Sequence, residues 1–127
     1  MKNGLHHVAL SAVNLDQTVD FYQKAFGFTL LRRWGEEKPA AMLDMGGDAI
    51  LEIFSGADEG EESGSRWLHI AVKTDDTDGC YEAALAAGAA EETPPKDIVI
   101  PTEPAFPARI AFVRGLNGEL IEIFCEK

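Results

Sequence analysis

Cysteine, histidine and basic residues are all scarce in this chain of 127 residues. The two cysteines, Cys80 and Cys125, are too few for a disulfide framework and lack the paired spacing of a zinc knuckle. With 11 Lys and Arg against 22 Asp and Glu, the net charge of -11 argues against the basic face needed to bind nucleic acid or an anionic membrane. We therefore expect two reduced thiols in a cytoplasmic protein with neither kind of partner.

Long apolar runs are missing as well. No stretch approaches the length of a membrane span, and the first residues lack the apolar segment of a signal peptide. A chain of 127 residues with 46% hydrophobic and 26% charged residues is typical of one compact globular domain, here residues 1–127.

One short pattern occurs twice in the sequence. Residues 49–54 read Ala-Ile-Leu-Glu-Ile-Phe and residues 119–124 read Glu-Leu-Ile-Glu-Ile-Phe, while a His-Val-Ala-Leu at His7 is answered by His-Ile-Ala-Val at His69. Such internal similarity predicts a duplicated structural unit. The expected parts are module 1 at about 1–56, an acidic Gly-rich linker at about 57–66 and module 2 at about 67–127.

Each half reads as a strand, a helix and three further strands, which predicts an α+β fold of two tandem βαβββ modules. Asn14 followed by Gln17 is typical of a helix start, and Gly27 of a helix end. Asp76 and Gly88 delimit the second helix in the same way. The expected strands are about 5–12, 29–34, 40–45 and 49–54, then 67–74, 90–93, 109–114 and 119–125.

The second half is longer by eight residues. The two His are 62 residues apart (69 − 7), whereas Glu52 and Glu122 are 70 apart (122 − 52). We assign the excess to a longer connection in the second half, at the prolines Pro94, Pro95, Pro101, Pro104 and Pro107.

Each copy places a histidine on its first strand and a glutamate on its last. Because side chains alternate along a strand, His7 shares a face with Ser11, and His69 shares one with Lys73. A carboxylate inside an apolar strand is costly to bury without a partner. If the two modules pair their curved sheets, four side chains would meet in one cavity: His7, Glu52, His69 and Glu122.

Two imidazoles and two carboxylates form a donor set that suits Ni(II), Co(II), Fe(II), Mn(II) or Zn(II) better than a thiolate-preferring ion. The two negative charges would neutralise a divalent ion, so we predict one such ion per site. A single histidine on an apolar strand is more often a core residue, and the prediction depends on four such residues at duplicated positions. His6, next to His7, is interpreted as a bystander pointing to the opposite face.

Several short motifs along the chain form a recognisable set. They are His7-Val-Ala-Leu-Ser, Asn14-Leu15-Asp16, Phe21-Tyr22, Phe26-Gly27-Phe28 and Asn117-Gly118-Glu119-Leu120-Ile121-Glu122. Together they resemble the motifs of the vicinal oxygen chelate superfamily over essentially the whole chain. Members of that superfamily include glyoxalase I, methylmalonyl-CoA epimerase, extradiol dioxygenases and fosfomycin resistance proteins. The resemblance implies two βαβββ modules that form an open, cup-shaped barrel, and a homodimer.

The second ligand position separates the activities of the superfamily. Epimerases of the methylmalonyl-CoA type usually carry Gln there, and dioxygenases and fosfomycin resistance proteins use three ligands. Glu52 resembles the residue of glyoxalase I, and the short loops resemble its nickel- or cobalt-activated bacterial form. The resemblance thus favours Ni or Co, with Zn, Mn or Fe as alternatives.

This likeness implies a lyase or isomerase that moves a proton through a metal-bound enediolate of a small vicinal-oxygen substrate, such as a thiol hemithioacetal. Glu122 is the implied base, and Glu52 is its symmetric counterpart. Two alternatives stay open. One is an epimerase or other enolisation enzyme with the same metal set, and the other is a small-molecule binding or resistance protein, against which four intact ligands weigh.

Two departures concern the thiol. Ser11 stands where glutathione-using bacterial relatives often carry an Arg, and Gly56 stands where they carry an Asn that contacts glutathione. We therefore do not expect this chain to make the contacts that hold glutathione in those relatives. The sequence leaves open whether the two His–Glu pairs meet within one chain or across a dimer. Candidate substrate contacts are Ser11, Lys73, Trp34 and Arg109, with Arg32 and Arg33 as further anion contacts.

Overall fold

The computed structural model describes residues 1–57, 67–116 and 118–127, and most of the expected linker lies outside them. The chain divides into an N-terminal unit, His7–Leu68, and a C-terminal unit, Met1–His6 with His69–Lys127. Among the described helices, none is long and apolar enough to cross a membrane.

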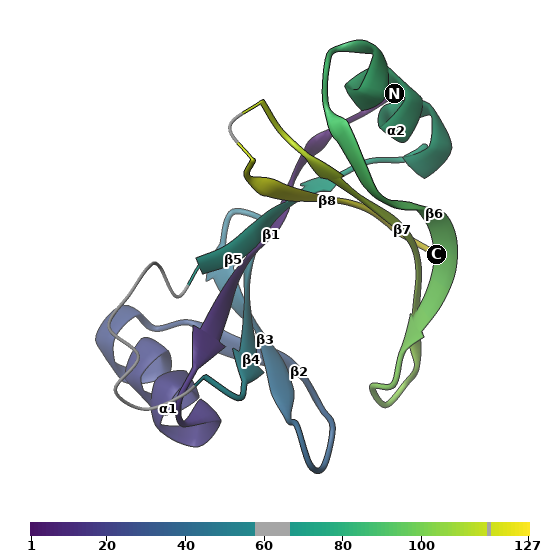
Figure 1. Cartoon of the computed structure of the whole chain (residues 1–127). Coiled ribbons are helices and arrows are strands. Elements are labelled where there is room, and N and C mark those ends of the chain that lie inside the picture. Colours follow the sequence, from purple (N-terminus) through teal and green to yellow (C-terminus); the bar gives the residue numbers. More distant parts are fainter. Residues whose placement is uncertain (58–66, 117) are drawn as a thin grey trace. The chain divides into compact units, whose positions relative to one another are not determined.

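The N-terminal unit contains one helix and four strands in the predicted order (Figure 1). Its sheet has the order β2-β3-β4-β1, in which β1 and β4 run parallel and the other neighbours antiparallel. α1 packs on the β2–β4 part of this sheet. The elements are β1 (Gly4–Ala12), α1 (Leu15–Phe26), β2 (Thr29–Trp34), β3 (Ala40–Gly46) and β4 (Ala49–Ser55).

Both predicted ends of α1 are confirmed. The Asn14 side chain accepts a hydrogen bond from the backbone N–H of Gln17 at 3.0 Å, which satisfies one of the unpaired donors of the first turn. Gly27 has a φ of 73°, in the left-handed region, and its N–H bonds the carbonyl of Gln23 at 3.0 Å. Leu15 and Val19 are buried against the sheet, so local capping and an apolar face together define this helix.

The C-terminal unit repeats the plan. Its sheet has the order β5-β8-β7-β6, with β5 and β8 parallel and the remaining neighbours antiparallel. α2 packs on β6, β7 and β8, and the Asp76 carboxylate caps it by accepting from the N–H of Gly79 at 3.0 Å. The elements are β5 (Trp67–Lys73), α2 (Thr77–Ala86), β6 (Ala90–Ile100), β7 (Phe106–Arg114) and β8 (Leu120–Glu126).

Part of the expected connection forms strand rather than loop, which corrects the prediction. β6 continues from Ala90 through Pro94 and Pro95 to Ile100, and Pro107 lies in β7, which begins at Phe106. Pro101 and Pro104 do lie in the connection between these two strands. Proline is tolerated in β6 because this strand pairs with β7 alone in its unit's sheet and can lack an N–H on the outer side. Two register shifts, between residues 91 and 93 and between 93 and 96, accommodate the interruption.

The α+β class and the two βαβββ modules are thus confirmed within each unit. Closure into a cup-shaped barrel stays a prediction.

Candidate metal centre

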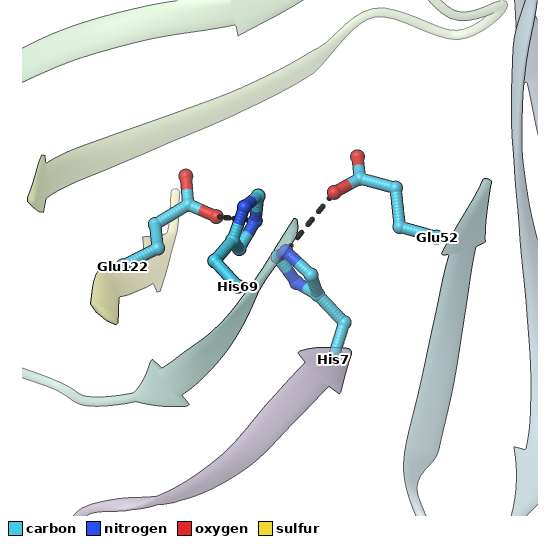
Figure 2. Close-up of side chains that lie close together, drawn as sticks. All are labelled: His7, Glu52, His69 and Glu122. Atoms are coloured by element: carbon cyan, nitrogen blue, oxygen red, sulfur yellow. Dashed lines mark ion pairs between the residues drawn. The ribbon is translucent and has the colours of Figure 1, made fainter. Parts of the chain in front are cut away.

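In the N-terminal unit, His7 and Glu52 lie on the side of the sheet that faces away from α1. Leu51 and Ile53, on either side of Glu52, belong to the core under α1, so strand alternation turns the carboxylate the other way. His7 Nε2 lies 3.0 Å from Glu52 Oε1, and both residues are buried (Figure 2). We call the side with the His–Glu pair the ligand face and the side under the helix the helix face.

The C-terminal unit repeats this arrangement. Ile123, next to Glu122, packs in the core under α2, and Glu122 therefore lies on the ligand face. His69 Nε2 is 3.2 Å from Glu122 Oε1 (Figure 2). Phe112 meets the His69 ring edge-on, with ring centroids 5.6 Å apart, and gives this pair an apolar neighbour.

A small residue makes room for each pair. In the parallel pairing of β1 with β4, Ala9 lies opposite Glu52, and in that of β5 with β8, Ala71 lies opposite Glu122. Both alanines are 0% exposed. Because a methyl group covers little of the neighbouring strand, the imidazole two residues earlier can reach the carboxylate diagonally. The repeated His-x-Ala pattern is thus the local cause of the repeated pair.

The spacing within each pair fits two ligands of one ion. Ligands about 2.0–2.2 Å from a metal, at an angle between about 90° and about 109°, lie roughly 2.9–3.5 Å apart. The observed N···O distances of 3.0 and 3.2 Å fall in this range. A buried carboxylate also needs a cationic or proton-donating partner, which a divalent ion supplies. The donors present therefore suit a divalent metal.

Ser11 and Trp34 lie on the ligand face of the N-terminal unit. Ser11 is opposite Phe54 in the β1–β4 register, and Phe54 follows Glu52 by two residues, so it shares its face. Trp34 meets Phe54 edge-on, with ring centroids 6.5 Å apart. The predicted substrate contacts Ser11 and Trp34 are thus placed beside the Glu52 side of the site.

A β-bulge decides which arginine reaches that face. The register of β2 with β3 shifts between Leu30 and Arg32, so that Arg32 lies opposite Met42, a residue paired in turn with Glu52. Such a shift turns the side chains after it to the other side of the sheet. Arg33 lies on the helix face and pairs with Asp16 at 2.7 Å.

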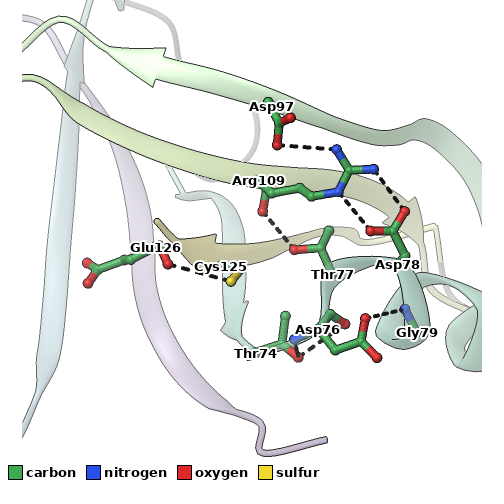
Figure 3. Close-up of polar contacts among 9 residues, drawn as sticks. All are labelled: Thr74, Asp76, Thr77, Asp78, Gly79, Asp97, Arg109, Cys125 and Glu126. Atoms are coloured by element: carbon green, nitrogen blue, oxygen red, sulfur yellow. Dashed lines mark hydrogen bonds and ion pairs between the residues drawn. The ribbon is translucent and has the colours of Figure 1, made fainter.

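In the C-terminal unit, Lys73 shares its face with His69 by alternation, whereas Arg109 does not. Arg109 donates from Nε and Nη2 to the Asp78 carboxylate of α2 at 2.7 and 2.9 Å, and from Nη1 to Asp97 at 3.2 Å (Figure 3). Its side chain therefore lies on the helix face. The structure does not bring this predicted substrate contact to Glu122.

Arg109 instead ties α2 to the sheet. The hydrogen bond to Asp78, followed by that to Asp97, raises the pKa of the guanidinium, and the same hydrogen bond lowers the pKa of Asp78. Thr77, at the start of α2, donates its hydroxyl to the Arg109 carbonyl at 2.8 Å (Figure 3). Both contacts position the helix rather than a substrate.

His6 is a residue that sequence reasoning set aside and the structure buries. It is 3% exposed, its Nε2 lies 3.0 Å from Glu126 Oε1, and its ring centroid is 4.2 Å from that of Phe124. Phe124 and Glu126 continue the alternation that begins at Glu122, so His6 lies along the ligand face of the C-terminal unit. The i, i+2, i+4 spacing of these β8 residues is the signal that could have identified it.

Known proteins resemble the whole chain. It is 27% identical over 128 residues to a Vibrio cholerae serotype O1 protein named probable lactoylglutathione lyase, covering 95% of this chain and 89% of that protein. The fold is similar to methylmalonyl-CoA epimerase from Mycobacterium tuberculosis, with a TM-score of 0.77, 20% identity and coverage of 98% and 88%. A variant of the Streptomyces coelicolor epimerase in complex with 2-nitronate-propionyl-CoA gives a TM-score of 0.73, with 23% identity and coverage of 96% and 93%.

The solved structures, at these identities, show the fold alone. A family model extends the likeness to the sequence, because it matches residues 4–123. This range contains both His–Glu pairs and nearly all of both modules. The chain therefore belongs to the Glyoxalase/Bleomycin resistance protein/Dioxygenase superfamily.

Proposed function

We propose that one divalent metal ion per chain is held by both His–Glu pairs together, His7 and Glu52 with His69 and Glu122. All four residues are of types that ligate metals, and one pair alone has fewer ligands than the three or four common in protein zinc sites. The nitrogen and oxygen donors favour Ni or Co, followed by Zn, Mn or Fe. The proposal rests on one observation, a close His–Glu pair with a buried carboxylate in each of two duplicated modules.

The reaction that these residues support best is proton transfer on a small substrate with two vicinal oxygens. A divalent ion, when bound, would polarise those oxygens and make the neighbouring C–H bond more acidic. Glu122 would accept the proton from one carbon, and Glu52 would return one to the adjacent carbon. The substrate is then isomerised with no net gain or loss of protons, as in a lyase or isomerase of the glyoxalase I type.

The substrate that we propose is the hemithioacetal of a 2-oxoaldehyde and a small thiol other than glutathione. Ser11 offers no guanidinium for a tripeptide carboxylate. Gly56 has a φ of 103°, which asparagine or any other residue with a Cβ adopts only at a cost. Arg32 and Lys73, the basic residues placed on the ligand faces above, suit a small anionic group.

An epimerase with the same metal set is the alternative. Removal and return of a proton by two carboxylates also inverts a carbon beside a carbonyl, and several of the solved structures with this fold are named methylmalonyl-CoA epimerase. Glu52 favours the isomerase, because the resemblance gives these epimerases Gln at that position.

The metal content of the untagged protein tests the proposal. We expect one ion per chain after reconstitution with Ni, Co, Mn, Fe or Zn, and none in Glu52→Ala or in Glu122→Ala. Glu126→Ala is the matched control, because Glu126 lies on the same strand and face as Glu122 but outside the proposed ligand set. The metal-loaded protein is then assayed with methylglyoxal hemithioacetals of glutathione and of cysteine, and with methylmalonyl-CoA.

Each result distinguishes the proposed function from one alternative. Half the metal retained in Glu52→Ala would mean that the two pairs bind ions independently, against the shared site. If the wild-type protein binds no metal specifically, the enzyme mechanism is wrong and a small-molecule binding protein is favoured. Inversion of methylmalonyl-CoA without hemithioacetal turnover would replace the isomerase by the epimerase.

A further inference from the structure

A cavity of about 340 Å³ lies on the helix face of the C-terminal unit, between α2 and the sheet. Its wall is almost entirely apolar. Since Ile121 and Ile123 turn to the opposite side of β8 from Glu122, the cavity is separate from the candidate metal centre. The residues that matter below are Cys80 and Ala84 of α2, Ala89 after it, and Val113, Ile121 and Ile123 of the sheet.

The duplicated helix of the N-terminal unit carries an aromatic ring where the cavity has a methyl group. The caps Asn14 and Asp76 align the two helices, so Tyr22 and Ala84 are equivalent, each eight residues after its cap (22 − 14 and 84 − 76). Tyr22 packs against the core of its unit.

The same difference recurs just after the helix. Phe28 follows a positive-φ glycine, Gly27, and precedes β2. Ala89 likewise follows Gly88, with a φ of 115°, and precedes β6. This alignment on the glycine places Ala89 one residue nearer to its helix N-cap than Phe28 is to its own (89 − 76 against 28 − 14). Phe28 packs against the N-terminal core, as Ala89 does against the C-terminal one. A second aromatic ring is thus replaced by a methyl group.

In the N-terminal unit these two rings stack on each other. The Tyr22 and Phe28 centroids are 5.8 Å apart and the ring planes differ by 6°. In the C-terminal unit, Ala84 and Ala89 stand where both rings would be, while the helix N-cap, the positive-φ glycine and the flanking strands are the same in the two units. The cavity therefore lies where the N-terminal unit has two parallel aromatic rings. A flat aromatic molecule of that size would match its shape.

We propose that this cavity is a binding site for a small apolar aromatic molecule of one or two rings. An apolar cavity of about 150 Å³ already binds benzene, and the present one has the size of small-molecule sites in general. Burying an apolar ring against Val113, Ile121 and Ile123 supplies the driving force.

The cavity's thiol does not alter this chemistry. Burial raises the pKa of Cys80, which opposes formation of the thiolate and leaves a weakly polar wall. A neutral aromatic molecule is therefore a better fit than an anion or an electrophile.

Toluene is the probe for the test, titrated into protein with ¹³C-labelled methyl groups. We expect saturable shifts of the methyl signals of Val113, Ile121 and Ile123. Ala84→Tyr, which introduces the ring of the N-terminal unit, should abolish them. Ala83→Tyr is the matched control, because it adds the same side chain at an exposed neighbouring position of α2, and it should bind toluene like the wild type.

Two results would overturn the proposal. One is the absence of saturable shifts up to the solubility limit of toluene, and the other is binding that survives Ala84→Tyr. If Ala84→Tyr fails to fold, Ala84→Leu fills part of the cavity with less bulk and should weaken binding, while unchanged binding would contradict the assignment. The metal assays do not enter this test, so the two proposals fail or hold separately.

Discussion

The two units are alike on their ligand faces and different on their helix faces. Each has a parallel strand pair, a His-x-Ala sequence and a His–Glu contact of 3.0 or 3.2 Å. Under the helices, however, one unit packs the stacked rings of Tyr22 and Phe28, whereas the other has alanines beside a cavity of about 340 Å³. The two copies are thus alike in the His–Glu pair on one side of the sheet and differ in the packing between sheet and helix on the other side.

The largest expected effect tests whether the equivalent glutamates do equivalent work. Glu122→Gln should lower turnover by at least about 100-fold, because a positioned general base contributes roughly 10²–10⁴-fold. Glu52→Gln should also block product formation but still exchange the substrate proton with deuterated water. The measurement is turnover and deuterium incorporation on the metal-loaded protein with the hemithioacetal it accepts. Near-normal turnover of Glu122→Gln would make its assignment as base wrong.

A matched pair of core substitutions tests the difference between the helix faces. Ile53 and Ile123 are equivalent and are 0% and 1% exposed. Ile-to-Ala changes in a core cost about 2–5 kcal/mol. We expect Ile53→Ala to cost about 1 kcal/mol more than Ile123→Ala, because Ile123 already borders a cavity, so its removal should break fewer packing contacts.

Urea unfolding of both variants, analysed with the slope as well as the midpoint, gives the two free-energy losses. Equal losses, or a larger loss for Ile123→Ala, would mean that the cavity does not loosen the packing of the C-terminal core.

A smaller difference is expected between the helix caps. Asn14→Ala removes a hydrogen bond of 3.0 Å and should cost about 1 kcal/mol in free energy of unfolding. Asp76→Ala removes an equal bond and also a negative charge at the helix N-terminus, which adds about 0.3–1 kcal/mol. Thermal unfolding at low and high salt separates the two contributions. The excess for Asp76→Ala should shrink at high salt, and a salt-independent excess would exclude the charge as its cause.

The smallest expected effect concerns Arg109 and Asp78, whose contact is exposed. The hydrogen bond from Arg109 lowers the folded-state pKa of Asp78 below its ordinary value of 3.8. The pair therefore stabilises the protein above that value and loses this contribution as the pH falls through the folded-state pKa. Asp78→Asn should be slightly less stable than the wild type at pH 7, and the two stabilities should converge in acid. A difference that persists at the lowest pH would assign the effect to geometry rather than charge.

Much of the fold could be predicted because its signals are local. Asn14 and Asp76 identify the helix starts from hydrogen bonds that span three residues, and alternation around Glu52 and Glu122 assigns each carboxylate to one face of its strand. The duplication added the expectation that the second half forms the same helix, strands and His–Glu pair as the first. These rules need only neighbours in the chain.

What the sequence misses concerns contacts between strands that are distant in the chain. It predicts a loop at Pro94 and Pro95, because it does not show that β6 pairs with β7 alone in its unit's sheet. It groups Arg109 with Arg32, whereas a register shift places Arg32 on the ligand face and two aspartates hold Arg109 on the other. It also gives no sign that the His6 ring packs on Phe124, more than 100 residues away.

The sequence by itself therefore determined the two modules, the N-caps of their helices and the four residues of the candidate metal centre, since each follows from capping preference, periodicity or repetition along the chain. Only the tertiary structure decided which arginine shares the ligand face with them, how long the β6–β7 hairpin is and where a cavity lies at the positions equivalent to Tyr22 and Phe28. Bulges, edge strands and packing volumes depend on partners that are distant in sequence.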